Sequence, residues 1–341
     1  MRAPRRAAFV VAALAAAILI GVGSPTEAQS VFEGFRRSVR AQDAFARGKV
    51  LYEARDYEGA RERLGEALTL DPNHDEARAL LGWSQYFLGE YRAAIITFKA
   101  AIQREPAWEG HYSGLGWSRL RLKRYHLATE AFRAALDHNP DYVDAMIGLG
   151  TSQFELGRYE AALAPLQTAL RRLEPLVGRE PAELPEVRAK VAWTLYYLGR
   201  YREALALFER GVRATPDWHG LYNGLGWCYL KLGQKPEARA AFQRALTLKP
   251  GYEDALEGLR QASNSGLRFR PNAQEQVAGR PVGAQLSLAS KAEARPHADA
   301  RGHADQQFFR PAGPLDGQPI APAIPELLGG QGDLVLDVAP A

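Results

Sequence analysis

The stretch WHGLYNGLGWCYLKL, residues 218–232, decides the fold, because an earlier stretch of the chain repeats it closely. Residues 108–122 read WEGHYSGLGWSRLRL, with the same Leu-Gly-Trp centre, and each stretch begins two residues after a proline. A self-match of this length indicates an internal repeat, so the first property to establish is its period.

The period can be read from the numbering of recurring small residues. Ala60, Ala94, Ala128 and Ala162 advance by 34 each time, and Ala204 and Ala238 resume this step after a single slip of eight. A second series shows the same step and the same slip at Gly48, Gly82, Gly116, Gly150, Ala192 and Gly226. Prolines close five of the units, at Pro72, Pro106, Pro140, Pro216 and Pro250. The chain therefore contains six copies of one unit and one eight-residue insertion.

The residues within each copy resemble the tetratricopeptide repeat (TPR) family, whose helix–turn–helix units carry small and aromatic residues at fixed positions. The pattern in the second copy is Leu81-Gly82, Tyr91, Ala94, Phe98, Ala101 and Pro106. In the third copy it is Tyr112, Leu115-Gly116, Tyr125, Ala128, Phe132, Ala135 and Pro140. Departures are local, at Ala192, Gly211 and Lys235. The resemblance covers residues 41–252 and implies an all-α fold, a right-handed α-solenoid of six tandem helix pairs with terminal helices.

The copies are expected to stack because one helix pair cannot bury its apolar side alone. Slots of the Gly82 and Ala94 type let two antiparallel helices approach closely, and large residues such as Tyr91 and Phe98 fill the space between pairs. The closing prolines end the second helices, since proline lacks an N–H and disfavours a helical residue before it. No stretch of the array is typical of a strand.

The insertion lies between copies 1–4, residues 41–176, and copies 5–6, residues 185–252. Residues 177–184 belong to the sequence EPLVGREPAELP, whose prolines and glycine predict a loop. Pro165 inside the preceding helix predicts a bend. Trp83, Trp108 and Trp117 recur at one constant step as Trp193, Trp218 and Trp227, so the array resembles a duplicated unit of three copies. The insertion marks a seam, either a flexible joint or a rigid elbow.

Residues 1–28 have the three parts of a secretory signal peptide, with early arginines, an apolar run over residues 7–22 and small residues up to Ala28. We expect cleavage after Ala28 and a periplasmic or secreted protein that meets the membrane only through this transient segment. The alternative is an uncleaved anchor, although the run is shorter than the ~20 residues of a spanning helix.

The two ends of the array are expected to carry helical caps, because terminal repeats have a neighbour on one side only. Ser30 and Glu33 match a capping box and predict a helix over residues 30–54, with residues 29–40 covering the N-terminal end. Residues 253–262 predict a C-terminal capping helix. The composition of residues 263–341 predicts a disordered tail. Residues 334–338 alternate apolar and acidic side chains and suit either addition to a partner's sheet edge or an unstructured end.

Residue patterns for chemistry are absent from the sequence. Cys228 is the only cysteine, so no internal disulfide forms, and a small core residue is the expected role of this thiol. The seven histidines show no ligand pair at helical spacing, and no phosphate loop, dinucleotide fingerprint or nucleophile motif is present. The formal charge of +4 is small for this length and comes partly from the early arginines, so it gives no case for nucleic acid. We expect no cofactor, no metal, no catalytic residue and no enzymatic activity.

The residue after each Leu-Gly lies, by resemblance to the family, on the side of the first helix that lines a concave groove. The predicted partner-binding residues there and in the slots three and four further on are Trp83, Tyr86, Trp117, Arg121, Trp193, Tyr196, Trp227 and Lys231. Small neighbours such as Gly114 and Gly224 predict cavities beside these rings. The family's peptide-carboxylate clamp has Asn where these Trp stand, so that activity is not carried over. The alternative is that the Trp side chains pack against the adjoining copy as core.

Two functions follow from these residues. The first is a periplasmic scaffold whose aromatic groove binds a protein or peptide of the cell envelope, since exposed Trp and Tyr give contact area at low entropic cost. The alternative is a glycan-binding module in exopolysaccharide or cell-wall assembly, in which the Trp rings stack on sugars while Arg121 and Lys231 neutralise uronate or phosphate. Neither function follows from the fold alone.

Overall fold

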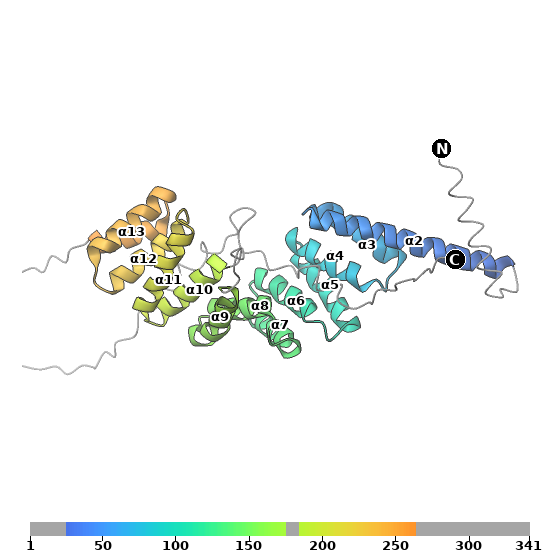
Figure 1. The fold of residues 1–341 in the computed structure, drawn as a ribbon, viewed down its shortest axis with the longest axis horizontal. Helices are drawn as coiled ribbons and strands as arrows, with labels where there is room; N and C mark the ends of the chain where they lie inside the picture. Colours follow the sequence, from blue (N-terminus) through green and yellow to red (C-terminus); the bar gives the residue numbers. More distant parts are fainter. Residues whose placement is uncertain (1–24, 175–183, 264–341) are drawn as a thin grey trace, which may run out of the picture. The chain divides into compact units, whose positions relative to one another are not determined.

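A computed structural model describes residues 25–174 and 184–263, and in these ranges the chain is made of helices joined by short turns (Figure 1). In chain order the helices are α2 (Pro25–Glu53), α3 (Tyr57–Leu70), α4 (Asp75–Phe87), α5 (Tyr91–Arg104), α6 (Glu109–Arg121), α7 (Tyr125–His138), α8 (Val143–Glu155), α9 (Tyr159–Leu173), α10 (Leu184–Tyr197), α11 (Tyr201–Ala214), α12 (His219–Lys231), α13 (Lys235–Leu248) and α14 (Glu253–Ser263). The described ranges contain no strand, which confirms the all-α prediction. Most of the predicted signal peptide, nearly all of the predicted insertion loop and the predicted tail lie outside the described residues.

The described helices fall into two units, α2–α8 and α9–α14, divided between Leu156 and Gly157. The division therefore does not lie at the seam expected around residues 174–185. The physical reason is that α9 and α10, on either side of the insertion, pack together. The rings of Tyr159 and Tyr197 stack at 4.6 Å, and Glu174 at the end of α9 lies 3.7 Å from the guanidinium of Arg188 on α10.

The two units follow one plan. Each unit has a run of six helices that begins with the second helix of one copy and ends with the first helix of a later copy. Helices α3–α8 therefore correspond in order to α9–α14. The eight extra residues lengthen the connection between α9 and α10, which corresponds to the short turn between α3 and α4. Helix α9 continues through Pro165. Helix α2 has no counterpart among the described helices of the second unit.

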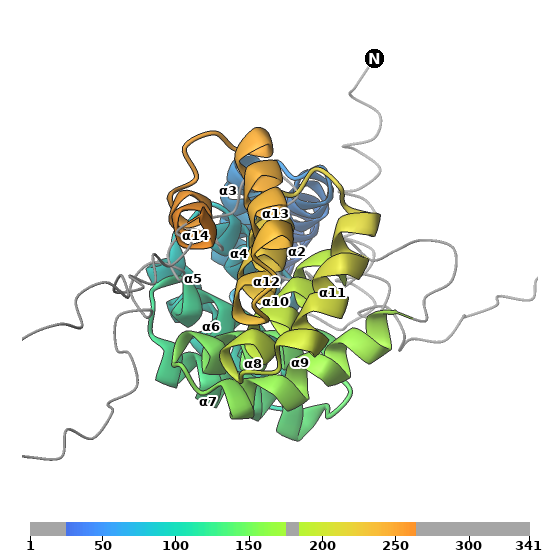
Figure 2. The ribbon, with the colours of Figure 1, turned by 90° about the vertical axis from the view of Figure 1, so that its left-hand side faces the viewer.

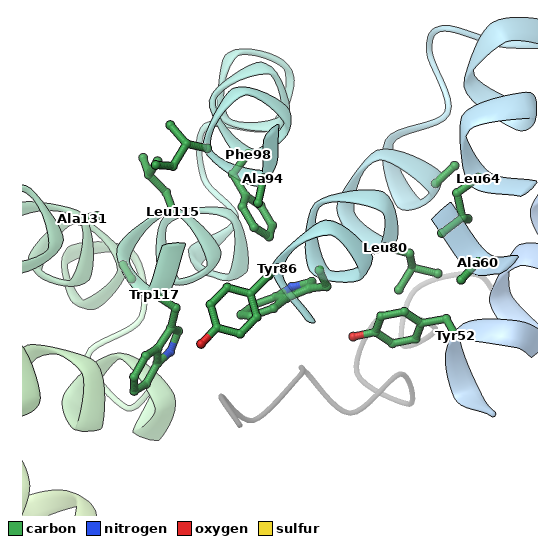
Figure 3. Close-up of a cluster of buried hydrophobic side chains, with 14 of the residues drawn as sticks. Tyr52, Ala60, Leu64, Leu80, Tyr86, Ala94, Phe98, Leu115, Trp117 and Ala131 are labelled. Atoms are coloured by element: carbon green, nitrogen blue, oxygen red, sulfur yellow. The ribbon is translucent and has the colours of Figure 1, made fainter. Parts of the chain in front are cut away.

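Small residues allow neighbouring helices to approach, and one phenylalanine per copy fills the remaining space. Figure 3 shows part of this core in the first unit, where Ala94 and Phe98 of α5 lie against the helices on either side. The side chains of Phe98, Phe132, Phe208 and Phe242 are completely buried. Their position confirms the prediction that this slot fills the space between helix pairs.

The end helices are confirmed in place, but the predicted start of the first one is wrong. Helix α2 begins at Pro25, so Ser30 lies inside the helix and donates to the carbonyl of Glu27 at 2.9 Å instead of capping it. Proline suits a first helical turn because its missing N–H has no partner there in any case. The predicted cleavage site after Ala28 falls within this turn.

The C-terminal cap agrees with its prediction. Helix α14 lies against α12 and α13 (Figure 2) and buries Ala255 and Ala262. Across residues 25–174 and 184–263 no helix has both the length and the apolar character needed to cross a membrane.

Candidate functional site

Five aromatic rings gather where α3, α4 and α5 meet, and we call them the first ring cluster: Tyr57, Trp83, Tyr86, Phe87 and Tyr91. Tyr57 stacks on Phe87 with a centroid distance of 4.5 Å, and Phe87 stacks on Trp83 at 6.1 Å. Tyr86 meets Trp83 edge to face at 5.7 Å and Tyr91 at 5.5 Å. Such offset and edge-to-face contacts are favourable beyond the burial of area alone.

The second unit repeats this arrangement in the second ring cluster: Tyr159, Trp193, Tyr196, Tyr197 and Tyr201. The corresponding centroid distances are 4.6 Å for Tyr159 and Tyr197, 6.2 Å for Trp193 and Tyr197, and 5.4 Å for both contacts of Tyr196. The structure thus brings Trp83 into contact with Tyr86, and Trp193 into contact with Tyr196.

Three of the four predicted tryptophans are buried, and the fourth is partly covered. The exposed fractions of Trp83, Trp117 and Trp193 are 1%, 8% and 5%, and Trp227 is half-buried. Each indole lies edge to face on the phenylalanine of its own copy, for example Trp117 on Phe132 at 5.3 Å. The expectation of exposed indole walls is therefore wrong, and packing as core, the alternative, describes these rings.

The expected cavities beside the rings are also wrong. Gly114 lies against the ring of Phe98, and a Cβ added there would stand 2.3 Å from that ring. Gly224 has the same relation to Phe208, at 2.4 Å. The glycines are thus needed for the close approach of a phenylalanine from the preceding second helix, which occupies the space that sequence reasoning left empty.

The accessible part of each cluster is its rim, which combines half-buried rings with a cation. In the first unit Phe87 and Tyr91 are half-buried, and the guanidinium of Arg121 lies 5.4 Å from the centroid of the Tyr91 ring. Its Nε donates to the Tyr91 hydroxyl at 3.0 Å. In the second unit Tyr197 and Tyr201 are half-buried, and Lys231 occupies the slot equivalent to Arg121 and is exposed.

The two rim cations lack an acidic partner within the described ranges. By contrast, Lys49, which occupies the tryptophan slot of the first copy, forms a 3.0 Å ion pair with Glu76. The first cluster therefore presents an apolar ring surface next to a guanidinium for which the described chain shows no ion pair, and the second unit has the exposed Lys231 in the equivalent slot.

A buried carboxylate lies beside Trp117, and sequence reasoning missed it. Asp144 at the start of α8 is 2% exposed. It accepts hydrogen bonds from the indole Nε1 of Trp117 at 3.0 and 3.1 Å and from the hydroxyl of Ser113. Buried carboxylates require such donors, because desolvation of the charge is costly. The arrangement fixes α6 against α8.

The second unit has the same device in a changed form. Asp254 of α14 accepts from the indole Nε1 of Trp227 at 3.1 Å and from the side-chain amide of Asn223. The step from Asp144 to Asp254 equals the step from Trp117 to Trp227, so the repeat comparison contained the signal for both carboxylates.

At the other two predicted tryptophans, Trp83 and Trp193, a glycine takes the slot of the carboxylate. The slot equivalent to Asp144 holds Gly110 in relation to Trp83, and Gly220 in relation to Trp193. The Nε1 of Trp83 is buried without a hydrogen-bond partner in the described ranges. The contact is therefore apolar in copies 2 and 5 and polar in copies 3 and 6, three copies apart.

The buried titratable groups near this surface are unsuited to acid–base or nucleophilic work. Burial lowers the pKa of His111 to about 3 and raises the pKa of the Cys228 thiol to about 12. Burial also raises the pKa of Tyr86 and of Tyr196. The described residues include no group of His, Cys, Asp and Glu side chains placed to hold a metal ion.

Stacked helix pairs whose small and aromatic residues recur at a fixed step define the class of α-helical repeat proteins. Comparison with known families shows which repeat family the chain belongs to. Tetratricopeptide repeat models match residues 51–115, 114–175 and 191–253. These matches cover more than half of the chain, which therefore belongs to the TPR family. No curated protein matches its sequence.

Two solved structures support the same fold, and a third is also similar. A chain of the APC/C hetero-tetramer Cut9–Hcn1 is 18% identical with a TM-score of 0.56; the match covers 68% of this chain and 46% of that chain, less than half its length. YrrB, described as a TPR protein with an unusual peptide-binding site, is 20% identical with a TM-score of 0.50, over 59% of this chain and 100% of that one. TTC0263 of Thermus thermophilus is 26% identical over 56% of this chain and 99% of that one, with a TM-score of 0.44.

Proposed function

We propose that this protein is a non-enzymatic scaffold of the periplasm whose two ring clusters bind a protein or peptide partner from the cell envelope. The observation that carries the proposal is the recurrence, in both units, of half-buried rings with a cation in the equivalent slot, Arg121 or Lys231, for which the described chain shows no ion pair. Apolar rings and an unneutralised charge together suit a segment with apolar side chains next to carboxylates. Aromatic residues and arginine are also the side chains most often decisive at protein interfaces.

A peptide partner is favoured over a glycan by the burial of the indoles. A sugar ring stacks on an open aromatic face, and Trp83 and Trp193 offer none. The tyrosines and Phe87 at the rim expose only part of their rings, which suits insertion of a side chain between them. YrrB, a structural relative, is described as having a peptide-binding site, which is in keeping with this proposal.

The proposal is tested by reversing the charge at each rim. Arg121→Glu and Lys231→Glu should each reduce recovery of a stoichiometric envelope protein with the purified scaffold by about tenfold, because a like charge placed at an interface disfavours binding. Arg133→Glu and Arg239→Glu are matched controls, since both side chains are exposed on second helices. Equal recovery with all four variants would rule out the rims as the binding surface.

Glycan binding is tested separately by titrating the protein with acidic oligosaccharides while following its tryptophan fluorescence. We expect no saturable change. A saturable change that Arg121→Glu abolishes would replace the peptide proposal with the glycan one.

The location is tested by the mass of the protein recovered from the periplasmic fraction. We expect an N-terminus at Gln29, because the segment before it has the composition of a cleaved signal. Recovery of the intact N-terminus in the membrane fraction would contradict the proposed location. It would not affect the binding proposal, which the Arg121→Glu and Lys231→Glu variants test.

A further inference from the structure

The residue after Leu-Gly in each copy has a counterpart in the first turn of the first helix that follows, and we call this counterpart the facing position. In the first copy the facing residue Glu76 pairs with Lys49 at 3.0 Å. In the third copy the facing residue Asp144 accepts a 3.0 Å hydrogen bond from the indole of Trp117. Counted by the repeat step, the facing position is acidic for four copies, at Glu76, Asp144, Glu186 and Asp254, and glycine for two, at Gly110 and Gly220.

Two buried donors of the first unit lie where the facing position is glycine. The indole Nε1 of Trp83 and the hydroxyl of Tyr52 have no hydrogen-bond partner in the described residues, and these side chains are only 1% and 7% exposed. Both rings lie beside the ring of Phe87, at centroid distances of 6.1 and 6.3 Å. Figure 3 shows the hydroxyl of Tyr52 directed from α2 toward α4. Buried donors without an acceptor cost free energy that phenylalanine at the same positions would not.

The next copy shows the same pair of side chains with an acid in the facing position. One repeat step after Tyr52 and Trp83 stand Tyr86 and Trp117. The carboxylate of Asp144 accepts from the indole of Trp117. Its charge also acts on the hydroxyl of Tyr86, whose pKa is raised by burial first and in smaller measure by Asp144. One carboxylate therefore lies near both the indole and the hydroxyl.

The second unit contains another example of this arrangement. Asp254 accepts from the indole of Trp227 at 3.1 Å. Burial raises the pKa of Tyr196, and the charge of Asp254 adds to this effect after two neighbouring groups. At the other glycine, Gly220, the tyrosine slot holds Phe154, which has no hydroxyl to satisfy. The pair of unsatisfied donors is thus a property of the first unit.

We propose that an acidic side chain of the bound partner places its carboxylate between the indole of Trp83 and the hydroxyl of Tyr52, in the role that Asp144 has one copy later. The inference rests on the proposed function, in which the first ring cluster binds a protein or peptide, and it names the chemical group that this cluster selects. A carboxylate is the group selected because the chain itself supplies an acid at the other equivalent positions of this unit. Both donors are neutral and protonated, since burial raises the pKa of Tyr52, so they donate to a carboxylate without changing charge.

Trp108 covers one side of this site. It precedes the first turn of α6, is half-buried, makes no capping hydrogen bond, and its ring lies 2.7 Å from a Cβ added at Gly110. Aspartate in the facing position follows a tyrosine two residues earlier, Tyr142 or Tyr252, whereas glycine follows Trp108 or Trp218. The indole of Trp108 therefore takes the side from which Asp144 reaches its donors, and it turns outward when a partner's carboxylate enters.

The binding of a carboxylate is tested on the full chain by following the indole N–H of Trp83 in a proton–nitrogen correlation spectrum, with Trp83→Phe to assign the resonance. The probe is the peptide acetyl-Leu-Asp-Leu-amide, and acetyl-Leu-Asn-Leu-amide is the matched control. We expect the aspartate peptide to shift the resonance saturably and the asparagine peptide to bind about tenfold more weakly, because hydrogen bonds to a charged acceptor are stronger. No shift, or equal shifts with the two peptides, would overturn the proposal.

A built-in carboxylate provides the competing test. Trp108→Tyr combined with Gly110→Asp gives the site the residues found at Tyr142 and Asp144. We expect a melting temperature no lower than that of the unchanged protein, because both donors gain an acceptor, and no shift of the Trp83 resonance with the aspartate peptide. A shift that persists in this variant would place the peptide's carboxylate elsewhere and overturn the proposal.

Tyr52→Phe tests the hydroxyl without adding a group to the site. The variant should keep or raise the melting temperature, since it removes an unsatisfied buried hydroxyl, while weakening the aspartate peptide by about fivefold. An unchanged affinity would overturn the assignment of Tyr52 to the site.

The rim variant separates this inference from the proposed function. If Arg121→Glu loses the envelope protein while the combined Trp108→Tyr and Gly110→Asp variant retains it, the partner uses the rim alone and only this inference fails. If both variants retain the envelope protein, the proposed function fails as well.

Discussion

Helices α3–α8 and α9–α14 share their ring contacts closely, yet their polar contacts differ. The distance between Trp83 and Tyr86 is 5.7 Å, and the distance between Trp193 and Tyr196 is 5.4 Å. In contrast, Ser113 gives way to Asn223 as the second donor to the carboxylate, and His111 gives way to Leu221. Interdigitated rings tolerate little change in shape, whereas a polar contact survives a change of donor provided the acceptor remains satisfied.

The strongest test of this equivalence is removal of the phenylalanine from either unit. Phe98→Ala and Phe208→Ala should each lower the free energy of unfolding by about 4 kcal/mol, since both rings are completely buried and leave a cavity. Urea denaturation followed by far-UV circular dichroism measures the loss. Ile96→Ala on the exposed side of α5 should cost less than about 0.5 kcal/mol. A loss at one phenylalanine only would break the equivalence of the units.

Removal of the buried carboxylate should cost more stability in the first unit than in the second. Asp144→Ala should cost about 3 kcal/mol, because it leaves the Trp117 N–H and the Ser113 hydroxyl buried without an acceptor. Asp254→Ala should cost about 1 kcal/mol, since Asp254 is only half-buried and water can replace it. Asp137→Ala, at an exposed position of α7, is the matched control in the same denaturation experiment. Equal losses at the two carboxylates would contradict this difference in burial.

His111 should make the stability of the first unit depend on pH. Its folded pKa of about 3 lies below the ordinary value near 6.5, so the unfolded chain binds a proton first. Stability is complete above about pH 6.5 and falls by roughly 1.4 kcal/mol per pH unit below it, until the folded pKa is reached. Groups that act on this imidazole are Glu105, in contact at 3.1 Å, and the nearby Asp75 and Arg78.

His111→Ala, which places there the residue found at Ala77 and Ala145, should flatten this dependence between pH 6 and pH 4 while lowering stability at neutral pH. Unfolding curves at several pH values measure the slope. An unchanged slope in the variant would assign the pH dependence to other groups.

The smallest expected difference concerns the rims. Tyr91→Phe removes the acceptor of the Arg121 hydrogen bond and should cost at most about 1 kcal/mol. Tyr201→Phe should leave the free energy of unfolding unchanged, because the Tyr201 hydroxyl has no hydrogen-bond partner in the described part of the second unit. Thermal denaturation of the two variants side by side measures the difference.

Sequence periodicity predicted the helix pairs well, because the repeat step fixes which residues are small and which are aromatic. It also related the two halves through the step from Trp83 to Trp193. It could not assign the tryptophans, since a residue that faces a groove and one that packs on Phe132 or Phe98 share the same spacing. Their burial depends on how far the next helix pair reaches over them, which is a property of packing.

The polar contacts were missed for a different reason. Asp144 is distant in sequence from Trp117, and a single acidic residue at a helix start usually acts as a favourable charge near the helix N-terminus. Asp144 stands out only when it is compared with Asp254, because the two carboxylates are separated by the same number of residues as Trp117 and Trp227. The division of the chain after Leu156 likewise depends on the packing of α9 against α10. No change in amino-acid composition near Leu156 indicates it.

The recurrence of the carboxylate contact every three copies has a consequence for the length of the array. Loss of a single copy would place Ala79 where Asp144 requires a hydroxyl, so the carboxylate would lose one of its donors. Loss of three copies together would bring matching slots back into register. Removal of one copy should therefore break this carboxylate contact, whereas removal of three consecutive copies should preserve it, although every copy removed also lowers the stability of the array.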